Sequence, residues 1–417
     1  MCITARYRFL SWSASSAGPM PDILKPETDD QLRDAVLWAA AEETPLELIG
    51  HGTKRSLGAG GSTNHVLDLS ALAGVVDYQP EELVLTARAC TSMLEIDSLL
   101  AARGQMLAFE PQDWGHLLSG RSNPGTLGGA VMSSSNGPRR IKAGAVRDHL
   151  LGFAGVSGRG EAFKAGGKVV KNVTGYDLSK LVTGSWGTLA AVSELTLKVL
   201  PAPEKTYTLL LYGEDARRGL LSLRDAARTA YEVSGLAYVP ADAAALSAVR
   251  YVREPGEAVT ALRLEGPEIS VKHRFGELKA MLGEEVETEE LHTHNSRKFW
   301  TEIRDVRLLP VGGAVWRVSL PSTEAPAFLD AIQPAHWVAN WAGGLLWLHE
   351  ESTTPDRAQA IRNALTAGGQ AMLVRAEDAA QDGLPAFQPL EPGLAALNRR
   401  VKENFDPHGI LNPGRMG

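Results

Sequence analysis

The sequence predicts an α+β fold of two domains followed by a C-terminal segment, and three observations lead to this prediction. The 417 residues are enough for two or three domains of ordinary size. In the first half, short strand-like segments alternate with glycine-rich loops, and residues 101–190 contain 17 of the 42 glycines. In the second half, strands and helices alternate in units of similar length, as in ferredoxin-like α+β domains. Residues 201–203, Pro-Ala-Pro, separate the two patterns.

Hydrophobic periodicity and capping residues predict the elements of the first half. Thr28 or Asp29 caps the first helix, and alternating apolar residues predict the last strand before the boundary. The predicted helices span residues 28–41 and 92–103, and the predicted strands span 46–49, 66–69, 75–78, 83–87 and 191–200.

The second half repeats a strand, a helix and a strand. The predicted strands span 206–212, 236–239, 259–264, 315–320, 337–341, 345–349 and 372–375. The predicted helices span 216–231, 269–282, 324–332 and 355–367. A last helix over 393–404 leads into the C-terminal segment FDPHGILNPG.

Composition excludes several classes of protein. Hydrophobic residues make up 44% of the chain, which argues against disorder. The net charge of −7 and the absence of basic runs argue against nucleic acid as a partner. Cys2 and Cys90 are too few for a disulfide framework, a four-cysteine zinc site or an iron–sulfur cluster. No apolar run is long enough for a membrane span, so we expect a cytoplasmic protein.

The first 21 residues are expected to lie outside the folded part of the chain. They are either a disordered arm or the result of a translation start assigned too far upstream, because Met20 looks like a better natural start. A targeting peptide is the weaker alternative, since serines interrupt the apolar stretch.

The loop after the strand at 46–49 is the first candidate site. Its glycines leave successive backbone N–H groups free to bind an anion, and this suits a diphosphate. A Rossmann fingerprint is the competing interpretation, and Asp68 resembles its ribose-binding acid. However, Arg55 stands where the third glycine belongs, and no long helix follows. An ordinary turn remains the other alternative.

Two further segments carry small and polar residues. Residues 124–137 could admit a flat ring and a ribityl chain, with helix packing as the alternative. In the segment 166–189, Lys171, Tyr176 and Asp177 could form a polar network beside a cofactor or could be structural caps. For Asp177 we favour the structural role.

These three segments, in this order, resemble the FAD-binding domain of the vanillyl-alcohol oxidase superfamily, which has the PCMH-type fold. Residues 405–414 resemble the C-terminal signature of its lactate and glycolate dehydrogenase branch. The segments GHGTKRSLG, TLGG, NGPRRIKAGAVRDHLLG and GGKVVKNVTGYDLSKL are together similar to the FAD-binding subunits of bacterial glycolate oxidases. The resemblance is dense over residues 22–203 and then limited to the C-terminal tail. It implies a PCMH-type FAD-binding domain over 22–203, an α+β cap or substrate-type domain over 204–390, and a segment 391–417 that packs back on the FAD-binding domain.

The resemblance also implies which residues hold FAD. Backbone amides of the first loop would bind the diphosphate: Gly50, His51, Gly52, Thr53 and Lys54. Further residues would line the cofactor or lie on the same wall: Thr126, Gly128, Gly129, Ser133, Ser134, Gly137 and Asp148. Val192 and Glu194 would lie near the adenine. Some relatives attach the flavin covalently through a histidine that follows the glycine pair, whereas His51 lies between two glycines, so we expect non-covalent FAD.

A flavin alone does not oxidise a 2-hydroxy acid, because the carboxylate needs a cation and the hydroxyl proton needs a base. The catalytic branch carries a metal-binding HxGDGxxH motif, but residues 341–349 lack its first histidine and its aspartate. His349, together with His292 and His294 in an expected loop, gives no convincing metal site, and we expect none.

Other residues of the second domain allow two interpretations. Arg304, Arg307 and Arg317 could hold a carboxylate or could be solvated. We expect most of the tryptophans to lie in the core, with a subunit interface as the alternative: Trp300, Trp316, Trp337, Trp341 and Trp347.

The resemblance thus implies an FAD-binding subunit of a glycolate oxidase complex that works with a catalytic flavin subunit and passes electrons to an iron–sulfur subunit. Such a complex could associate with the inner face of the membrane through these partners. A free-standing FAD-dependent 2-hydroxy acid oxidoreductase is one alternative, and the degenerate histidine motif argues against it. A non-catalytic assembly subunit is the other, and the intact glycine loops argue against it.

Overall fold

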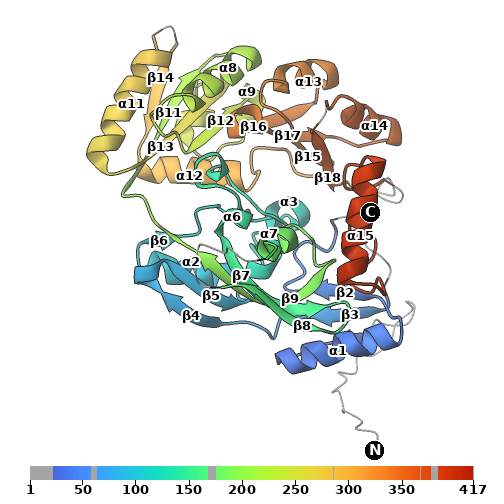
Figure 1. Cartoon of the computed structure of the whole chain (residues 1–417). Coiled ribbons are helices and arrows are strands. Elements are labelled where there is room, and N and C mark those ends of the chain that lie inside the picture. The colour runs from blue at the N-terminus through green and yellow to red at the C-terminus, as the bar shows by residue number, and fades with distance from the viewer. Residues whose placement is uncertain are drawn as a thin grey trace, which may run out of the picture.

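A computed structural model describes residues 22–57, 63–167, 175–284, 286–366, 368–376 and 384–416. The expected N-terminal arm and Lys171 lie outside these residues. Figure 1 shows two bodies, one built from the first half of the chain and one from the second, with α15 (Pro392–Phe405) running between them. No helix in the described ranges is long and apolar enough to cross a membrane.

The first body contains two sheets. A parallel sheet has the strand order β1 (Asp22–Leu24), β3 (His65–Asp68) and β2 (Leu46–Ile49). An antiparallel sheet has the order β4 (Val75–Gln79), β5 (Val84–Arg88), β9 (Ala190–Lys198), β7 (Leu150–Ser157) and β8 (Ala162–Gly166). A short pair, β6 (Gln105–Met106) and β10 (Leu200–Pro201), lies at its end.

The helices of the first body are mostly short. Thr28 caps α1 by accepting a hydrogen bond from the N–H of Gln31, as the sequence predicts, and Ser92, expected inside the second helix, is the cap of α2. The helices are α1 (Asp29–Ala41), η1 (Pro80–Glu82), α2 (Met93–Ala101), α3 (Gly115–Ser119), α4 (Leu127–Met132), α5 (Arg140–Ala143), α6 (Val146–His149) and α7 (Leu178–Val182). Asp177 caps α7 through the N–H of Lys180, which is the structural role that we favoured.

The second body is one eight-stranded antiparallel sheet made of two ferredoxin-like units. Their strand orders are β14-β11-β13-β12 and β16-β17-β15-β18, and β12 joins β16 through Tyr238 and Ala339. The strands are β11 (Lys205–Tyr212), β12 (Gly235–Val239), β13 (Val259–Gly266), β14 (Thr288–Leu291), β15 (Ala314–Ser319), β16 (His336–Asn340), β17 (Leu345–Glu350) and β18 (Gln370–Arg375). The helices are α8 (Ala216–Ala227), α9 (Ala241–Ala244), α10 (Arg250–Arg253), α11 (Glu268–Leu282), α12 (Thr293–Arg304), α13 (Ala325–Ile332), η2 (Trp341–Gly343) and α14 (Pro355–Asn363).

The two faces of this sheet have different neighbours. Residues of α8, α11, α13 and α14 pack on one face in a single core. On the other face Val315 and Trp347 share a core with Leu57, Trp114 and Leu117 of the first body. The open face of the ferredoxin-like sheet is therefore turned toward the first body, and the expected core role of the tryptophans is confirmed, since Trp300, Trp316, Trp341 and Trp347 are buried and Trp337 packs against the core.

Ion pairs strengthen this contact between the bodies. Glu110 of the first body accepts two hydrogen bonds from Arg263 at 2.9 and 3.0 Å. Arg139 lies 2.7 Å from both Glu110 and Glu265. All of these side chains are at most 15% exposed. Each charge is therefore neutralised by a partner at short range.

The segment around His292 and His294 differs from the prediction. Instead of a loop, β14 is followed directly by α12, and His292 is the N-cap residue of that helix. The start of α12, Thr-His-Asn-Ser, consists of polar residues with low helix propensity, but Phe299, Trp300 and Ile303 bury the inner face of the helix. Tertiary packing thus forms a helix that the sequence pattern did not predict.

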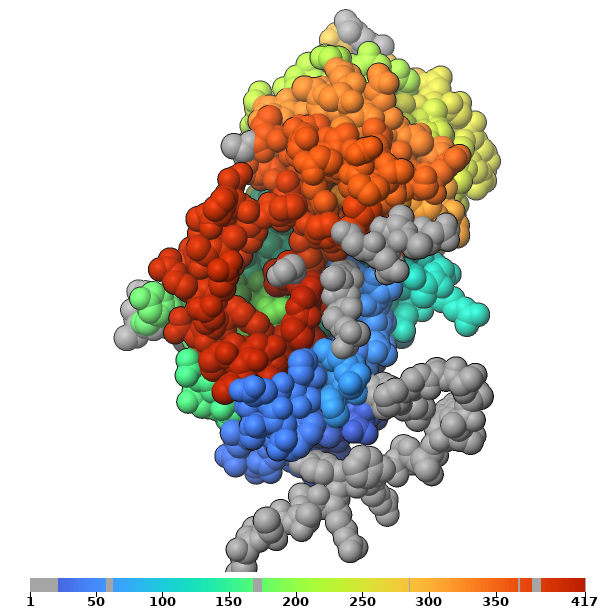
Figure 2. Space-filling model, turned by 90° about the vertical axis from the view of Figure 1, so that its right-hand side faces the viewer, coloured from blue at the N-terminus to red at the C-terminus, as the bar shows by residue number. Residues whose placement is uncertain are grey.

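The C-terminal segment returns from the second body to the first. Figure 2 shows α15 bridging the two, with an opening between it and the rest of the molecule. Beyond α15, the N–H of Leu46 donates to Ile410, and the N–H of Asn412 donates to Leu46, so the tail lies along the edge of β2. Asp406 caps the turn by accepting from the N–H groups of Ile410 and Leu411. The end of the chain is therefore part of the first body's structure.

Candidate cofactor site

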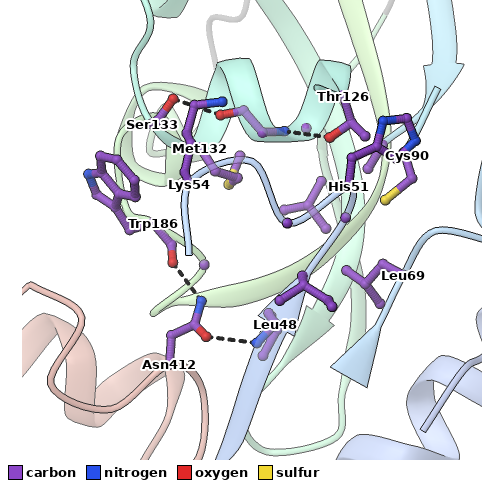
Figure 3. Close-up of a pocket in the computed structure, with 18 of the residues that line it drawn as sticks. Leu48, His51, Lys54, Leu69, Cys90, Thr126, Met132, Ser133, Trp186 and Asn412 are labelled. Carbon is purple, nitrogen blue, oxygen red and sulfur yellow. Dashed lines mark hydrogen bonds between the residues drawn. The ribbon is translucent and has the colours of Figure 1, made fainter. Parts of the chain in front are cut away.

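A cavity lies where β2, α4, β9 and the C-terminal tail meet (Figure 3). It contains about 830 Å³ of space not filled by the chain, part of it open to solvent. Its lining residues come from four stretches that are far apart in the sequence, namely 47–55, 89–90, 126–133 and 186–192. Leu69 and the tail residues Asn412 and Arg415 complete the lining.

The loop after β2 presents unpaired backbone donors to this cavity. The N–H groups of His51, Gly52, Thr53 and Lys54 have no hydrogen-bond acceptor among the described residues. Gly52 has a φ of +68°, a left-handed conformation in which a glycine is strongly preferred. Successive unpaired amides in such a turn form a concave anion-binding surface.

The side chain of Lys54 adds a positive charge to the same surface. Lys54 is 9% exposed, and its ammonium group has no hydrogen-bond or ion-pair partner in the described part of the chain. Burial lowers the pKa of Lys54 to about 8, although the negative charge of Asp113 opposes the shift. A buried ammonium without a partner is costly, and a bound anion would remove that cost.

The N–H groups in the first turn of α4 are already hydrogen-bonded, so this turn gives a ligand room but no free donors. The N–H groups of Leu127 and Gly128 donate to Thr91 and Ala89, and that of Gly129 donates to the side chain of Thr126. A Cβ at Gly128 would lie 2.8 Å from the carbonyl oxygen of Ala89, so this glycine is required for packing. A Cβ at Gly129 would lie 3.1 Å from Thr126 Oγ1 and 3.7 Å from Lys54 Nζ, inside the cavity lining.

The rest of the cavity wall is mostly apolar. It includes Leu69, Ala89, Met132, Trp186 and Ala190. Cys90 also lines it, and burial raises the pKa of its thiol to about 12, so the thiol stays protonated and is no nucleophile near neutral pH. Such a wall suits the flat, largely apolar face of a ring system.

The C-terminal tail holds two parts of the cavity in place. Asn412 accepts a hydrogen bond from the N–H of Leu48 and donates one to the carbonyl of Trp186, each at 2.7 Å. Arg415 donates to the carbonyl oxygens of Lys54 and Arg55. Sequence reasoning did not select Asn412 or Arg415, although it singled out the tail motif, because nothing local shows which strand the tail meets.

Most of the residues that the resemblance selected meet in this cavity. Those that line it are Gly50, His51, Gly52, Thr53, Lys54, Thr126, Gly128, Gly129, Ser133 and Val192. Sequence reasoning did not select Cys90, Met132 and Trp186, which also line it, because apolar residues of these types fill any core.

Four selected residues lie outside the lining. Ser134 has a left-handed backbone and its hydroxyl accepts a hydrogen bond from Asn136. The carbonyl of Gly137 accepts from the indole N–H of Trp341 at 3.0 Å. Asp148 accepts from the N–H of Ala145 at the start of α6. Glu194 lies in β9, paired with Arg88 and Ala154. In the structure these residues have roles in turns, caps and sheet pairing.

The polar residues considered in the second body do not form a metal site. The Nε2–H of His349 donates a hydrogen bond to the carbonyl of Gly312, and burial lowers the pKa of the ring. Arg304 and Arg307 pair with Asp305 and are therefore not free to hold a carboxylate. Within the described ranges, no group of three potential metal-ligating side chains comes together.

The cavity fits FAD on physical grounds. Unpaired amides and the orphan ammonium of Lys54 match a diphosphate, and the apolar wall matches a ring. Two family models also match the chain: "FAD binding domain" over residues 21–166 and "FAD linked oxidases, C-terminal domain" over residues 389–416.

Solved structures confirm the PCMH-type fold. A structure of p-cresol methylhydroxylase with substrate bound has a TM-score of 0.67 and 15% identity, and the match covers 95% of this chain and 88% of that one. A structure of alkyldihydroxyacetonephosphate synthase has a TM-score of 0.66 and 15% identity, with 94% of this chain and 76% of that one covered. At this identity the likeness concerns the fold alone.

Curated relatives narrow the family. Glycolate oxidase subunit GlcD of Bacillus subtilis (strain 168) is 25% identical over 445 residues, which cover 95% of this chain and 89% of the relative. Glycolate oxidase subunit GlcE of Escherichia coli (strain K12) is 35% identical over 394 residues, which cover 92% of this chain and 96% of the relative. With the fold, the two family models and this full-length likeness in agreement, the chain belongs to the family of glycolate oxidase subunit GlcE, whose cofactor is FAD.

Proposed function

We propose that this chain is the cytoplasmic FAD-carrying subunit of a glycolate oxidase complex. The observation that carries the proposal is the buried ammonium of Lys54, which has no partner among the described residues, beside the amides of residues 51–54, which have no acceptor there. A site without a ligand gains nothing from a desolvated cation, whereas a diphosphate would pair with it. The full-length likeness to a glycolate oxidase subunit supports the choice of reaction.

Each part of the cavity has a separate task. FAD, when bound, accepts the electrons of substrate oxidation. Lys54 and the loop amides would hold its diphosphate, and Gly129 leaves room for it. Asn412 fixes β2 to the Trp186 turn and so keeps the apolar wall at a constant distance from the loop. The flavin would be held non-covalently, so that acid precipitation would release it from the protein into the supernatant.

The electrons would leave through another chain. The full sequence has two cysteines, too few to hold an iron–sulfur cluster, and Cys90 is buried in the cavity wall. Passing electrons onward therefore needs a partner, and we propose an iron–sulfur subunit alongside a second, catalytic flavin subunit. The chain would associate with the inner face of the membrane through these partner subunits.

Purification of the tagged chain, alone and from cells that contain its natural partners, tests this proposal. We expect the chain alone to carry one FAD, and its flavin colour to persist when glycolate is added without oxygen. The complex should lose the colour under the same conditions. A colourless chain would contradict FAD binding, and bleaching of the isolated chain by glycolate would instead favour a free-standing oxidoreductase.

A further inference from the structure

Two arginines from different bodies meet on one tryptophan. Arg140, in α5, and Arg317, in β15, place their guanidinium carbons 4.4 and 5.4 Å from the ring centroid of Trp341. Trp341 is 6% exposed, and its indole N–H is fixed by the carbonyl of Gly137 at 3.0 Å. The ring therefore holds both guanidinium groups at the contact between the two bodies.

Neither guanidinium group has an acidic partner within 4 Å or a hydrogen-bond acceptor in the described part of the chain. Burial lowers the pKa of Arg317 to about 10, and repulsion by Arg140 adds to the shift. The pKa of Arg140 is lowered by burial and by Arg147, with the more distant Asp148 opposing. Stacking on an aromatic ring offsets only part of the cost of such a pair of like charges.

The other arginines at this contact have acidic partners. Arg139 and Arg263 pair with Glu110, and Arg139 also pairs with Glu265. Arg304 forms two hydrogen bonds with its neighbour Asp305. Within the described ranges, the neighbouring arginines thus pair with carboxylates, whereas Arg140 and Arg317 have no acidic partner.

Arg140 lies close in sequence to a stretch that lines the cofactor cavity. Ser133, at the end of α4, lines that cavity, and Gly137 and Arg140 follow it within two short turns. On β15, Val315 belongs to the core shared with the first body, so alternation along the strand places Arg317 on the same face. Arg317 is partly buried and Arg140 is exposed, so the pair lies at the edge of the contact between the two bodies.

We propose that Arg140 and Arg317 bind a small carboxylate between the two bodies. Planar guanidinium groups match a carboxylate by paired, charge-assisted hydrogen bonds, and two of them discriminate in favour of an anion. The identification of this carboxylate as a 2-hydroxy acid rests on the proposed function. Because arginine stays protonated, the pair would hold the acid without accepting its hydroxyl proton, so binding would occur without turnover by the isolated chain.

Calorimetric titration of the purified chain with glycolate, in a buffer free of other carboxylates and of phosphate, tests the proposal. We expect Arg317→Met and Arg140→Met each to weaken glycolate binding at least about tenfold. Arg317→Lys, which keeps the charge but loses the planar fork, should weaken it less. Arg250→Met is the matched control, since Arg250 also lies over an aromatic ring, that of Tyr251, but on the surface; this variant should bind like the parent.

The outcomes separate this inference from the proposed function. Absence of glycolate binding, equal binding by Arg317→Met, Arg317→Lys and the parent, or tighter binding of inorganic phosphate than of glycolate would each overturn the carboxylate site. Thermal unfolding of every variant shows whether it has folded, and its FAD content should equal that of the parent because neither arginine lines the cofactor cavity. If the parent chain lacks FAD yet loses glycolate binding on substitution, the proposed function fails while the carboxylate site stands.

Discussion

Asn412 accepts a hydrogen bond from the backbone N–H of Leu48 at 2.7 Å, although 364 positions separate the two residues. Leu48 lies in β2, the strand that leads into the diphosphate loop, and the other side of the Asn412 amide donates to Trp186. The backbone of Asn412 is left-handed, with a φ of +44°, which asparagine tolerates better than most residues. One side chain at the end of the chain therefore holds two walls of the cofactor cavity.

Replacing Asn412 tests this link. Asn412→Ala removes both hydrogen bonds and strains the turn, and we expect it to lower the free energy of unfolding by about 2–4 kcal/mol and to weaken FAD binding. Asn412→Asp keeps the acceptor for Leu48 but loses the donor to Trp186, so it should have an intermediate effect. Thermal unfolding and fluorescence titration with FAD measure the two quantities, and parental FAD affinity in the alanine variant would contradict the role assigned to the tail.

Gly129 offers a test that separates cofactor binding from folding. Alanine favours a helix more than glycine by up to about 1 kcal/mol, so Gly129→Ala should leave the unfolding temperature of the FAD-free chain equal or higher. Its Cβ would nevertheless lie between Thr126 and Lys54 in the cavity, and FAD affinity should fall at least about tenfold.

Gly276→Ala is the control for this substitution. Gly276 lies inside α11, and a Cβ there would meet no atom within 4 Å. This variant should gain stability and bind FAD normally. Unchanged FAD affinity in Gly129→Ala would show that the diphosphate does not lie over the first turn of α4.

The ion-pair cluster at the contact of the two bodies predicts a dependence of stability on pH. Burial alone would raise the pKa of Glu265, but Arg263 and Arg139 outweigh it and lower the pKa to about 2; the pKa of Glu110 is lowered by the same arginines. Because the folded pKa is below the ordinary value of 4.5, this stabilisation is complete above that value and is lost as the pH falls toward about 2.

Glu110→Gln isolates this effect. The variant leaves Arg263 and Arg139 short of a counter-charge, and we expect a loss of about 3–5 kcal/mol of unfolding free energy at neutral pH, with a weaker decline on acidification. Glu277→Gln, on the exposed surface of α11, is the control. Denaturant unfolding between neutral pH and the acid limit of solubility gives both curves, and parallel curves for parent and Glu110→Gln would refute the assignment.

Local sequence predicted what depends on local chemistry. The strand at 46–49, the cap at Thr28 and the diphosphate loop follow from an apolar run, a hydroxyl side chain and glycine spacing. By contrast, β7 was not predicted, because its glycines resemble a loop. In the structure a Cβ at Gly152 or Gly155 would lie within 3 Å of the backbone of a neighbouring strand, so these glycines allow close strand approach.

Long-range arrangement explains the rest. The pKa of Lys54 depends on its burial and on the distant Asp113, and the role of Asn412 depends on a tail that crosses from the other end of the chain. The Arg140 and Arg317 pair comes from two bodies that no local pattern brings together. Spacing rules describe neighbours in sequence, and these contacts are set by how the two sheets face each other.

The affinity for FAD of Lys54→Met, compared with the parent across pH, shows whether the buried ammonium of Lys54 binds the diphosphate. The folded pKa of Lys54 is about 8, below its ordinary value of 10.5, and a bound diphosphate would favour the charged form. We therefore predict that the parent binds FAD more weakly as the pH rises above about 8, and that Lys54→Met binds at least about tenfold more weakly at neutral pH with little dependence on pH. Lys272→Met, at the surface of α11, should match the parent. Equal FAD affinity in Lys54→Met and the parent at every pH would contradict the account.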